Sequence, residues 1–283
     1  MIGGAAGLTG AVALAARAAK RAGAGYVIAA VPSSLADVLA IKLTEEMTRP
    51  MPESPSRALD LGALGDLLAG AERADVVTLG SGMSGELSTA ELVRRLAAGI
   101  AKPVVIDADG LNAFAGRGED LGRAPRAADG MPAARIVTPH LGEMARLTGL
   151  EPAALELHRI DVAREWAARW NVTVVLKGAP TVTAHPGGHA TVNPTGNPGL
   201  ATAGTGDALC GVIAALAGQG LAPYDAARLG VFVHGLAGDR AAAELGQLGM
   251  CASDVIAELP RALKALAAIR DEALERRAPA GLS

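Results

Sequence analysis

The chain has 283 residues, about half of them apolar, with a formal net charge of −3 and only 2% aromatic residues. Scattered Lys and Arg with few aromatics exclude nucleic acid as an expected partner. No uncharged segment reaches the ~18 residues of a membrane span, so we expect no membrane contact either. The length suits one α/β domain with a core of Ala, Leu and Val.

Short β-branched runs alternate with Ala- and Leu-rich runs from the start of the chain to about residue 178. The expected strands cover 26–31, 75–80, 103–109, 134–140 and 172–178. The clearest helical stretches around them cover 11–22, 88–98 and 155–170. The strands are continuously apolar, as in strands covered on both faces, so we predict an α/β fold with a mostly parallel sheet between helices.

The remaining segments are expected to be loops or helices. The stretches 48–57 and 115–132 carry Pro, Ser, Gly and charges without a period, which predicts surface loops. The sequence "HPGGHA" at 185–190 predicts a hairpin turn. Four helices are expected after it, over 207–218, 223–245, 251–258 and 260–276, followed by a disordered tail at 277–283.

The two cysteines, Cys210 and Cys251, form no C-x-x-C pair. This argues against a disulfide scaffold and a structural zinc site and fits a reducing cytosol, so we predict a cytoplasmic protein. Cys210 lies in an apolar run and is interpreted as a small buried hydrophobe rather than a nucleophile.

Polar residues follow four of the expected strands at their carboxyl ends. They are Gly80 and Gly82, Asp107 and Asp109, His140 and Glu143, and Lys177. In an open parallel sheet this edge is where ligands bind, so the pattern predicts one site there.

The segment "AGTGD" is a glycine loop that enters a helix. Free amides at a helix start attract anions, and Gly204 and Gly206 allow close approach, so a phosphoryl group is a fitting ligand. Asp207 beside it would accept a proton from a hydroxyl that attacks phosphorus. The alternative is that Asp207 caps the helix. The long approach "NPTGNPGLAT" favours the functional interpretation, because a cap does not need it.

Each of the other candidates also has a structural alternative. Lys177 could meet phosphate as a point cation or be a solvated lysine. Glu143 could simply be a carboxylate that the helix dipole favours in the first turn, and His140 could be a capped loop histidine. Asp107 and Asp109, two residues apart on a strand, could position metal or substrate, or close a turn with Asn112.

The motifs together resemble a known family. "GTGD" at a helix start is similar to the anion hole of the ribokinase-like superfamily. More narrowly, "GLTGAVALAARAAKRAGAGYV", "VIDADGLNAF", "VTPHLGEMARLTG", "VLKGAPTVTA" and "NPTGNPGLATAGTGDALCGVIAALAGQG" resemble the ADP/ATP-dependent NAD(P)H-hydrate dehydratases. The match continues through "VFVHGLAGDRAA" and "ASDVIAELP". It implies a ribokinase-like three-layer α/β/α sandwich, with residues 1–283 as a single domain.

The resemblance implies a lyase that repairs nicotinamide cofactors. The S form of NAD(P)H hydrate would be phosphorylated at its C6 hydroxyl by ADP or ATP, and loss of phosphate would restore NADH or NADPH. Bacterial relatives mostly use ADP, which favours ADP here. The resemblance also implies Mg²⁺ as cofactor and a homo-oligomer, a tetramer in many relatives.

The resemblance assigns roles to residues that match the family's motifs. Asp207 is the expected base, and Gly204, Thr205 and Gly206 form the cradle for the migrating phosphoryl group. The expected nucleotide site consists of Lys177, Gly178, Ala179, Pro180, Thr181 and Gly206. The expected substrate contacts are Ala11, Gly82, Asp109, His140 and Asp207. Glu143 is expected to hold Mg²⁺ through water.

The sequence departs from the family in several places. Ser81 stands where the family usually has Pro between two glycines, which leaves backbone contact but reduces loop rigidity. The opening "MIGGAAG" predicts a first strand that is missing or reduced to two residues, through a misassigned start codon or a lost sheet edge. The epimerase domain of some relatives is absent, so we expect a separate epimerase partner. His234 and Asp239 are expected to pack near the site but not in it.

Two other classes of function stay open at this point. One is a ribokinase-like vitamin kinase that acts on hydroxymethylpyrimidine, thiazole or pyridoxal. "TPH" in place of "TPN" and the "DADGLN" segment argue against it. The other is a non-catalytic nucleotide sensor, which would have no need of Asp207.

Overall fold

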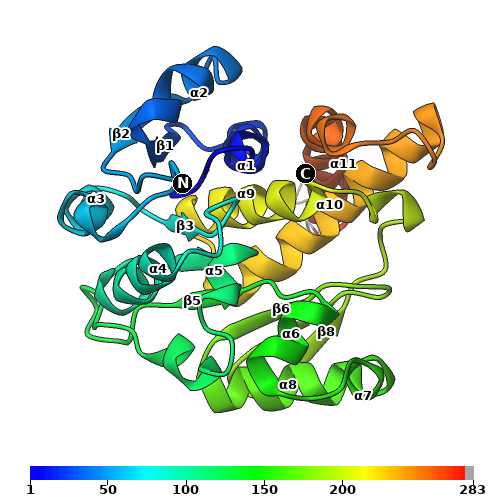
Figure 1. The fold of residues 1–283 in the computed structure, drawn as a ribbon. Coiled ribbons are helices and arrows are strands. Elements are labelled where there is room, and N and C mark those ends of the chain that lie inside the picture. Colours follow the sequence, from blue (N-terminus) through cyan, green and yellow to red (C-terminus); the bar gives the residue numbers. More distant parts are fainter. Residues whose placement is uncertain (278–283) are drawn as a thin grey trace.

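The computed structural model describes residues 1–277, and its centre is a six-stranded sheet in the order β3-β4-β5-β6-β7-β8 (Figure 1). The strands are β3 (Val77–Leu79), β4 (Val104–Ile106), β5 (Arg135–Val137), β6 (Thr173–Leu176), β7 (Val182–Ala184) and β8 (Ala190–Val192). Strands β3 to β6 are parallel, whereas the hairpin β7–β8 is antiparallel. The mostly parallel sheet, its first four strands and the hairpin turn at 185–190 are therefore confirmed.

A second, two-stranded sheet pairs β1 (Ile28–Pro32) in parallel with β2 (Met47–Met51). The prediction of a loop over 48–57 was wrong at its start, because residues 48–51 belong to β2. Its Pro50 is tolerated because β2 is an edge strand, where a missing N–H disrupts no ladder.

Residue Ile2 joins the two sheets. It makes single parallel bridges to Ala30 on β1 and to Leu79 on β3. The opening segment therefore lies between β1 and β3 rather than at an outer edge of the sheet. Apolar neighbours there stay covered, and Ile2 is itself buried.

Helices cover both faces of the main sheet (Figure 1). On one face lie α1 (Thr9–Arg21), α9 (Thr205–Gly218), α10 (Pro223–Leu245) and α11 (Ala252–Arg277). On the other lie α3 (Leu64–Glu72), α4 (Leu87–Gly99), α6 (Leu141–Thr148), α7 (Pro152–Leu157) and α8 (Arg159–Trp170). Along β4, Val104 and Ile106 pack toward the second group and Val105 toward α9 and α10, as the period of a strand requires.

Short elements complete the described chain. These are α2 (Ala36–Lys42), α5 (Asp109–Asn112) and the 3₁₀ turns Ser33–Leu35, Leu61–Ala63, Gly118–Gly122 and Pro198–Leu200. No helix within residues 1–277 has both the length and the apolar content needed to cross a bilayer.

Two predicted helix boundaries were wrong. The segment 155–170 is two helices, α7 and α8, which meet at His158. Helix α11 runs straight through Pro260, where a break was expected. A proline costs about 3 kcal/mol inside a helix, but Val255, Leu259 and Ala262 are fully buried against neighbouring helices and hold both sides of it. Residues 278–283 of the predicted disordered tail lie outside the described residues.

Helix α9 is the element that carries the predicted base, and its position is fixed by close packing. It is buried nearly all round and lies directly on α1. A Cβ at Gly211 would lie 2.1 Å from the carbonyl oxygen of Ala15, so only glycine allows this approach. Cys210, in the preceding position, is buried as predicted.

Candidate active site

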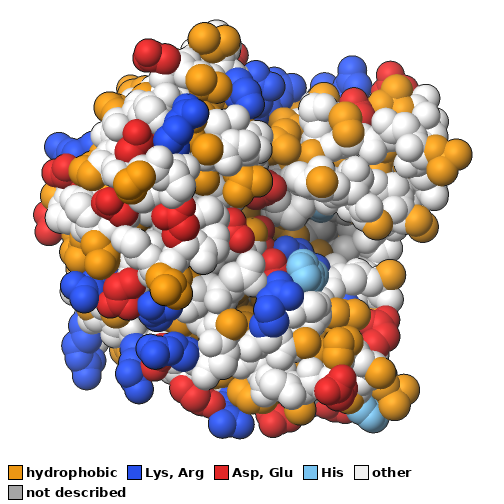
Figure 2. All heavy atoms as spheres, in the orientation of Figure 1, with side chains coloured by type: hydrophobic (Ala, Val, Ile, Leu, Met, Phe, Trp, Pro, Cys, Tyr) orange, Lys and Arg blue, Asp and Glu red, His pale blue; other side chains and the backbone are white. Residues whose placement is uncertain are grey.

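A cavity of about 960 Å³ opens at the carboxyl ends of β4, β5 and β6, beside the first turn of α9. Figure 2 shows this face hollowed, with acidic, basic and histidine side chains around the hollow. Predicted site residues in its lining are His140, Glu143, Lys177, Gly178, Ala179, Pro180, Thr181, Gly204, Thr205, Gly206 and Asp207. The structure therefore brings together most of the residues singled out from the sequence.

Lys177 is the centre of the charge cluster in this cavity. Its Nζ lies 2.8 Å from Oδ1 of Asp107 and 3.7 Å from Oε2 of Glu143. Thr138 donates a further hydrogen bond to Asp107 Oδ1, at 2.7 Å. Burial alone would lower the pKa of Lys177, but the two carboxylates outweigh it and raise that pKa above its ordinary value. Lys177 is thus a charged ammonium, and the alternative of a solvated lysine was wrong.

Asp207 lies in the first turn of α9 but does not cap it. The N-cap is Gly204, with a φ of 91°, and no side chain caps the helix. The capping interpretation of Asp207 was therefore wrong, and its carboxylate is available to the cavity. Burial, and next the nearby Asp107 carboxylate, raise the pKa of Asp207 to about 6. A carboxylate in this range is well matched to accept a proton near neutral pH.

The start of α9 offers its amides to the same space. A Cβ added at Gly206 would lie only 3.3 Å from Lys177 Nζ. The absence of a side chain at Gly206 therefore leaves room between the first turn of α9 and the ammonium group. Thr205 is buried and donates from its hydroxyl to the carbonyls of Leu200 and Thr202, both at 2.8 Å. Amides and a cation on two sides of a small space suit an anion such as a phosphoryl group.

His140 and Glu143 form a capping box at the start of α6. Nδ1 of His140 accepts from the amides of Gly142 and Glu143, at 3.0 and 3.3 Å, and Glu143 Oε2 accepts from the His140 amide at 2.8 Å. The structural alternatives raised for these two residues are therefore present. They do not remove His140 from the site, since its imidazole is 54% exposed, although its Nε2 lies 3.5 Å from Oε1 of Glu143 and a ligand there would share or displace that contact.

The predicted substrate residues Ala11, Gly82 and Asp109 do not line the large cavity. Gly82 and Ala11 lie together nonetheless, because a Cβ at Gly82 would be 3.1 Å from that of Ala11, and Asp109 is linked to the same segment through the amide of Ser84. Asp109 closes a turn, accepting from the Ser84 amide at 3.0 Å and from Asn112 at 3.3 Å. Its charge also contributes to the raised pKa of Asp207. Asp207 therefore stands between the large cavity and this second group.

One histidine of the cavity wall was predicted to lie outside the site. His234 on α10 lines the cavity, so its placement outside the site was wrong, whereas the prediction for Asp239 agrees with its absence from the lining. Burial lowers the pKa of His234 to about 4, so the imidazole is neutral, and its Nε2 has no hydrogen-bond partner.

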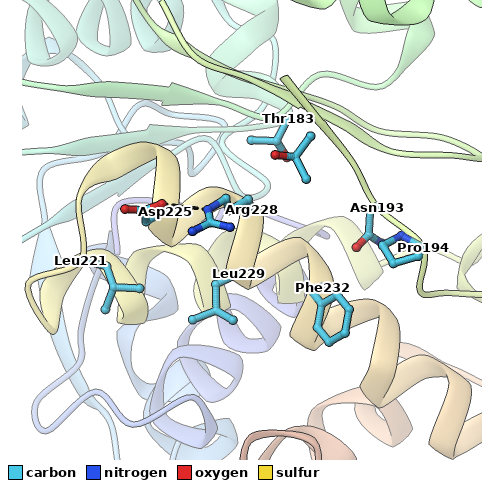
Figure 3. A pocket seen from close by; sticks show the side chains of 9 residues that line it. Thr183, Asn193, Pro194, Leu221, Asp225, Arg228, Leu229 and Phe232 are labelled. Atoms are coloured by element: carbon cyan, nitrogen blue, oxygen red, sulfur yellow. Dashed lines mark hydrogen bonds and ion pairs between the residues drawn. The ribbon is translucent and has the colours of Figure 1, made fainter. Parts of the chain in front are cut away.

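A second, smaller cavity of about 230 Å³ lies beside the β7–β8 hairpin (Figure 3). Figure 3 shows Leu221, Leu229 and Phe232 along one wall. Its charged residues, Asp225 and Arg228, pair with each other at 2.7 Å. The predicted base, cation and histidine all lie in the large cavity instead.

The carboxylates of the large cavity suit a magnesium ion that keeps most of its water ligands. Among residues 1–277 no three His, Cys, Asp or Glu side chains come together as a ready metal cage. Glu143 and Asp107 do present carboxylate oxygens there, both on buried side chains. Mg²⁺ usually keeps several waters and needs one or two carboxylates besides substrate phosphates, so these residues could hold it.

The mostly parallel sheet, the first turn of α9 and Lys177 define an α/β protein of the ribokinase-like type. Its site lies at the carboxyl ends of the strands. Residues 1–261 match the family described as NAD(P)H-hydrate dehydratase. The chain belongs to this family.

Relatives and a solved structure agree. A bifunctional NAD(P)H-hydrate repair enzyme Nnr from Moorella thermoacetica is 46% identical over 281 residues, which cover 99% of this chain and 51% of that one. An ADP-dependent (S)-NAD(P)H-hydrate dehydratase from Xanthomonas campestris pv. campestris is 35% identical, with 94% and 88% covered. The chain spans about half the length of the bifunctional relatives.

The solved structure is the ADP/ATP-dependent NAD(P)H-hydrate dehydratase of Bacillus subtilis, co-crystallised with ATP/Mg²⁺ and soaked with CoA. It superimposes with a TM-score of 0.76 at 27% sequence identity and covers 93% of this chain and 90% of that one.

Proposed function

We propose that this chain dehydrates the S form of NAD(P)H hydrate back to NAD(P)H at the expense of ADP or ATP, as a single ribokinase-like domain. The observation that carries the proposal is the position of Asp207. It combines a pKa of about 6 with a place in the first turn of α9, beside Lys177 and the Asp107 carboxylate. A base, an anion site and a cation around one cavity suit phosphoryl transfer to a hydroxyl.

In the proposed reaction Asp207 takes the proton of the C6 hydroxyl as its oxygen attacks the terminal phosphorus of the nucleotide. The amides at Gly204–Gly206 and the Lys177 ammonium balance the charge of the transferring group. The C6–O bond then breaks, with the ring nitrogen lone pair expelling phosphate. Loss of a proton from C5 to solvent restores the C5–C6 double bond, so the hydrate has lost its C6 oxygen as phosphate and its two protons to Asp207 and water.

The remaining assignments follow the walls of the cavity. Lys177 to Thr181, at the end of β6, are proposed to bind the nucleotide together with Gly206. His140, through Nε2, and the group of Ala11, Gly82 and Asp109 on the other side of Asp207 are proposed to contact the hydrate. Glu143 would hold Mg²⁺, which would neutralise nucleotide phosphate charge when bound.

We also propose a co-substrate, a partner enzyme, an assembly and a compartment for this reaction. ADP is the preferred co-substrate, on the strength of the Xanthomonas relative's name. The bifunctional relatives support cooperation with an NAD(P)H-hydrate epimerase. A homotetramer is supported by exposed apolar side chains around the small sheet, namely Tyr26, Ile28, Ile41 and Met47. Two free cysteines are compatible with the cytoplasm.

The test is to incubate the purified chain and Mg²⁺ with NADH hydrate or NADPH hydrate and either ADP or ATP, and to follow the return of dihydropyridine absorbance. We expect recovery that requires nucleotide and releases one phosphate per cofactor restored. No recovery, together with phosphorylation of a vitamin alcohol, would identify a kinase instead. Nucleotide binding without turnover of any of these compounds would identify a sensor.

A further inference from the structure

We propose that Asp239 is a positioning residue for the nucleotide site, and that it acts by accepting hydrogen bonds from the loop at residues 193–202. We call this segment the cavity loop. The inference rests on the proposed function only in taking an adenine nucleotide as the ligand. Asp239 itself lies outside the cavity lining, so any effect on a ligand must pass through the loop.

The cavity loop forms a whole wall of the large cavity. Its lining residues are Asn193, Pro194, Thr195, Gly196, Asn197, Pro198, Leu200, Ala201 and Thr202. Apart from one 3₁₀ turn at Pro198–Leu200 it has no regular secondary structure. Its place therefore depends on contacts with neighbouring elements.

Those contacts come from one face of α10. Thr195 donates from its hydroxyl to the carbonyl of Phe232 at 2.9 Å. Further along α10, a Cβ at Gly235 would lie 2.2 Å from Thr195 Oγ1, and a Cβ at Gly238 would lie 2.7 Å from a methyl of Leu200. The two glycines thus let the loop lie directly against the helix.

Asp239 holds the middle of the loop with both carboxylate oxygens. Oδ2 accepts from the amide of Gly196 at 2.9 Å, and Oδ1 accepts from Nδ2 of Asn197 at 3.0 Å. The other end of the Asn197 amide is also used, since its Oδ1 accepts from the Gly199 amide at 3.0 Å and starts the 3₁₀ turn. The orientation of Asn197 is therefore fixed, with its donor toward Asp239.

The loop is tied in turn to the proposed anion site. The Thr205 hydroxyl donates to the carbonyl of Leu200, the last residue of the 3₁₀ turn, and to that of Thr202, two residues further on. Displacement of the loop from α10 would consequently disturb both the wall of the cavity and the entry to Gly206. We expect the consequence in nucleotide affinity rather than in the proton transfer, because Asp207 is held by α9.

The arrangement allows an exchange experiment. Asn197→Asp places a second carboxylate against Asp239, and Asp239→Asn places one amide donor against another. The double variant with both changes restores one donor and one acceptor, since an aspartate at 197 still accepts from Gly199 and an asparagine at 239 still accepts from Gly196. Each single variant should weaken ADP binding on the order of tenfold, a usual size for coupling between contacting residues.

The double variant should bind ADP within roughly threefold of wild type. Calorimetric binding of ADP and of ATP gives affinity without reliance on turnover, and the KM for nucleotide should follow it while kcat at saturation stays nearly constant. Glu244→Gln is the matched control, because it removes a carboxylate from an exposed position of the same helix.

Folded single variants that bind nucleotide like wild type would overturn the role of Asp239. So would a double variant that regains its melting temperature but not its affinity, since that result describes a purely structural contact. Wild-type protein that binds neither ADP nor ATP would contradict the proposed function instead, and would remove the nucleotide role of the loop with it.

Discussion

Two cations at opposite ends of the parallel strands, one buried and one partly buried, show how this fold separates support from chemistry. Arg135 opens β5 and Lys177 follows the end of β6. Arg135 donates to main-chain carbonyls alone, those of Ala97, Ile100, Lys102, Ala133 and Ala134. Lys177 instead faces carboxylates, one at 2.8 Å and one at 3.7 Å.

The difference lies in what remains for a ligand. Arg135 engages Nε and both terminal nitrogens, and its carbonyl partners fix α4 and the flanking loops to the sheet. Burial lowers its pKa to about 10, which still leaves it charged. Lys177 has three donors and one short partner, and both of its carboxylates border the cavity. An entering anion can therefore join the Lys177 cluster but finds no donor at Arg135.

The largest effect on turnover is expected from Asp207→Asn. An amide cannot accept the hydroxyl proton, and general-base catalysis contributes on the order of 10²–10⁴-fold, so we expect a loss of about 10³-fold in kcat. Nucleotide binding should persist, because the amides of α9 and Lys177 are unchanged. Single-turnover recovery of NADH absorbance and calorimetric ADP binding measure the two quantities. Near-normal turnover would show that another group takes the proton.

Removal of the cation should come next. Lys177→Met keeps the length of the side chain but leaves Asp107 buried beside an apolar group. We expect nucleotide affinity to fall on the order of 10²-fold, as for loss of a charge-assisted contact. Breaking a buried pair typically costs about 3 kcal/mol or more in unfolding free energy. Lys177→Arg tests whether charge alone suffices; full recovery in that variant would show that the compact shape of the ammonium is not required.

Acid pH should act through Asp207 more gently. With a pKa of about 6 the base is increasingly protonated below that pH, so kcat/KM should fall about tenfold per pH unit there. Its pKa lies above the ordinary 3.8, so the folded state holds the proton more tightly. The free energy of unfolding should therefore decrease as pH rises from about 4 to 6 and stay lower above it.

Asp207→Asn should remove both dependences and be slightly more stable than wild type at pH 7.5. Thermal unfolding of the two proteins between pH 4 and 8 measures this. Parallel stability curves would mean that Asp207 is not the group that titrates.

Some of this organisation follows from the sequence and some does not. The continuously apolar strands and their polar carboxyl ends led to the sheet edge where Lys177, Glu143 and Asp207 meet. A single sequence gave no sign that Arg135, in an otherwise apolar strand, is buried among carbonyls. Nor did it show that His234 reaches the cavity, because helical spacing tells which residues share a face but not what that face packs against. The prediction of a helix break at Pro260 was wrong because the packing of the residues on both sides of it outweighs the tendency of proline to end a helix.

Glu143→Gln should have a smaller effect. A glutamine can still accept from the His140 amide, so the start of α6 stays intact. The lost charge should raise the Mg²⁺ concentration for half-maximal turnover roughly tenfold, with kcat at saturating Mg²⁺ close to wild type. A titration of Mg²⁺ at fixed nucleotide measures it, and an unchanged Mg²⁺ requirement would place the ion elsewhere.

The least effect on turnover is expected from Arg135→Met, although its effect on stability is large. The change leaves carbonyls at the start of β5 and the end of α4 without donors, at about 1–3 kcal/mol for each buried group left unsatisfied. Denaturant unfolding should therefore show a loss of at least about 3 kcal/mol. Because none of those carbonyls borders the cavity, KM for nucleotide and kcat per folded molecule should match wild type. A changed KM in this variant would mean that the two ends of the sheet are coupled, and the separation drawn from the two cations would fail.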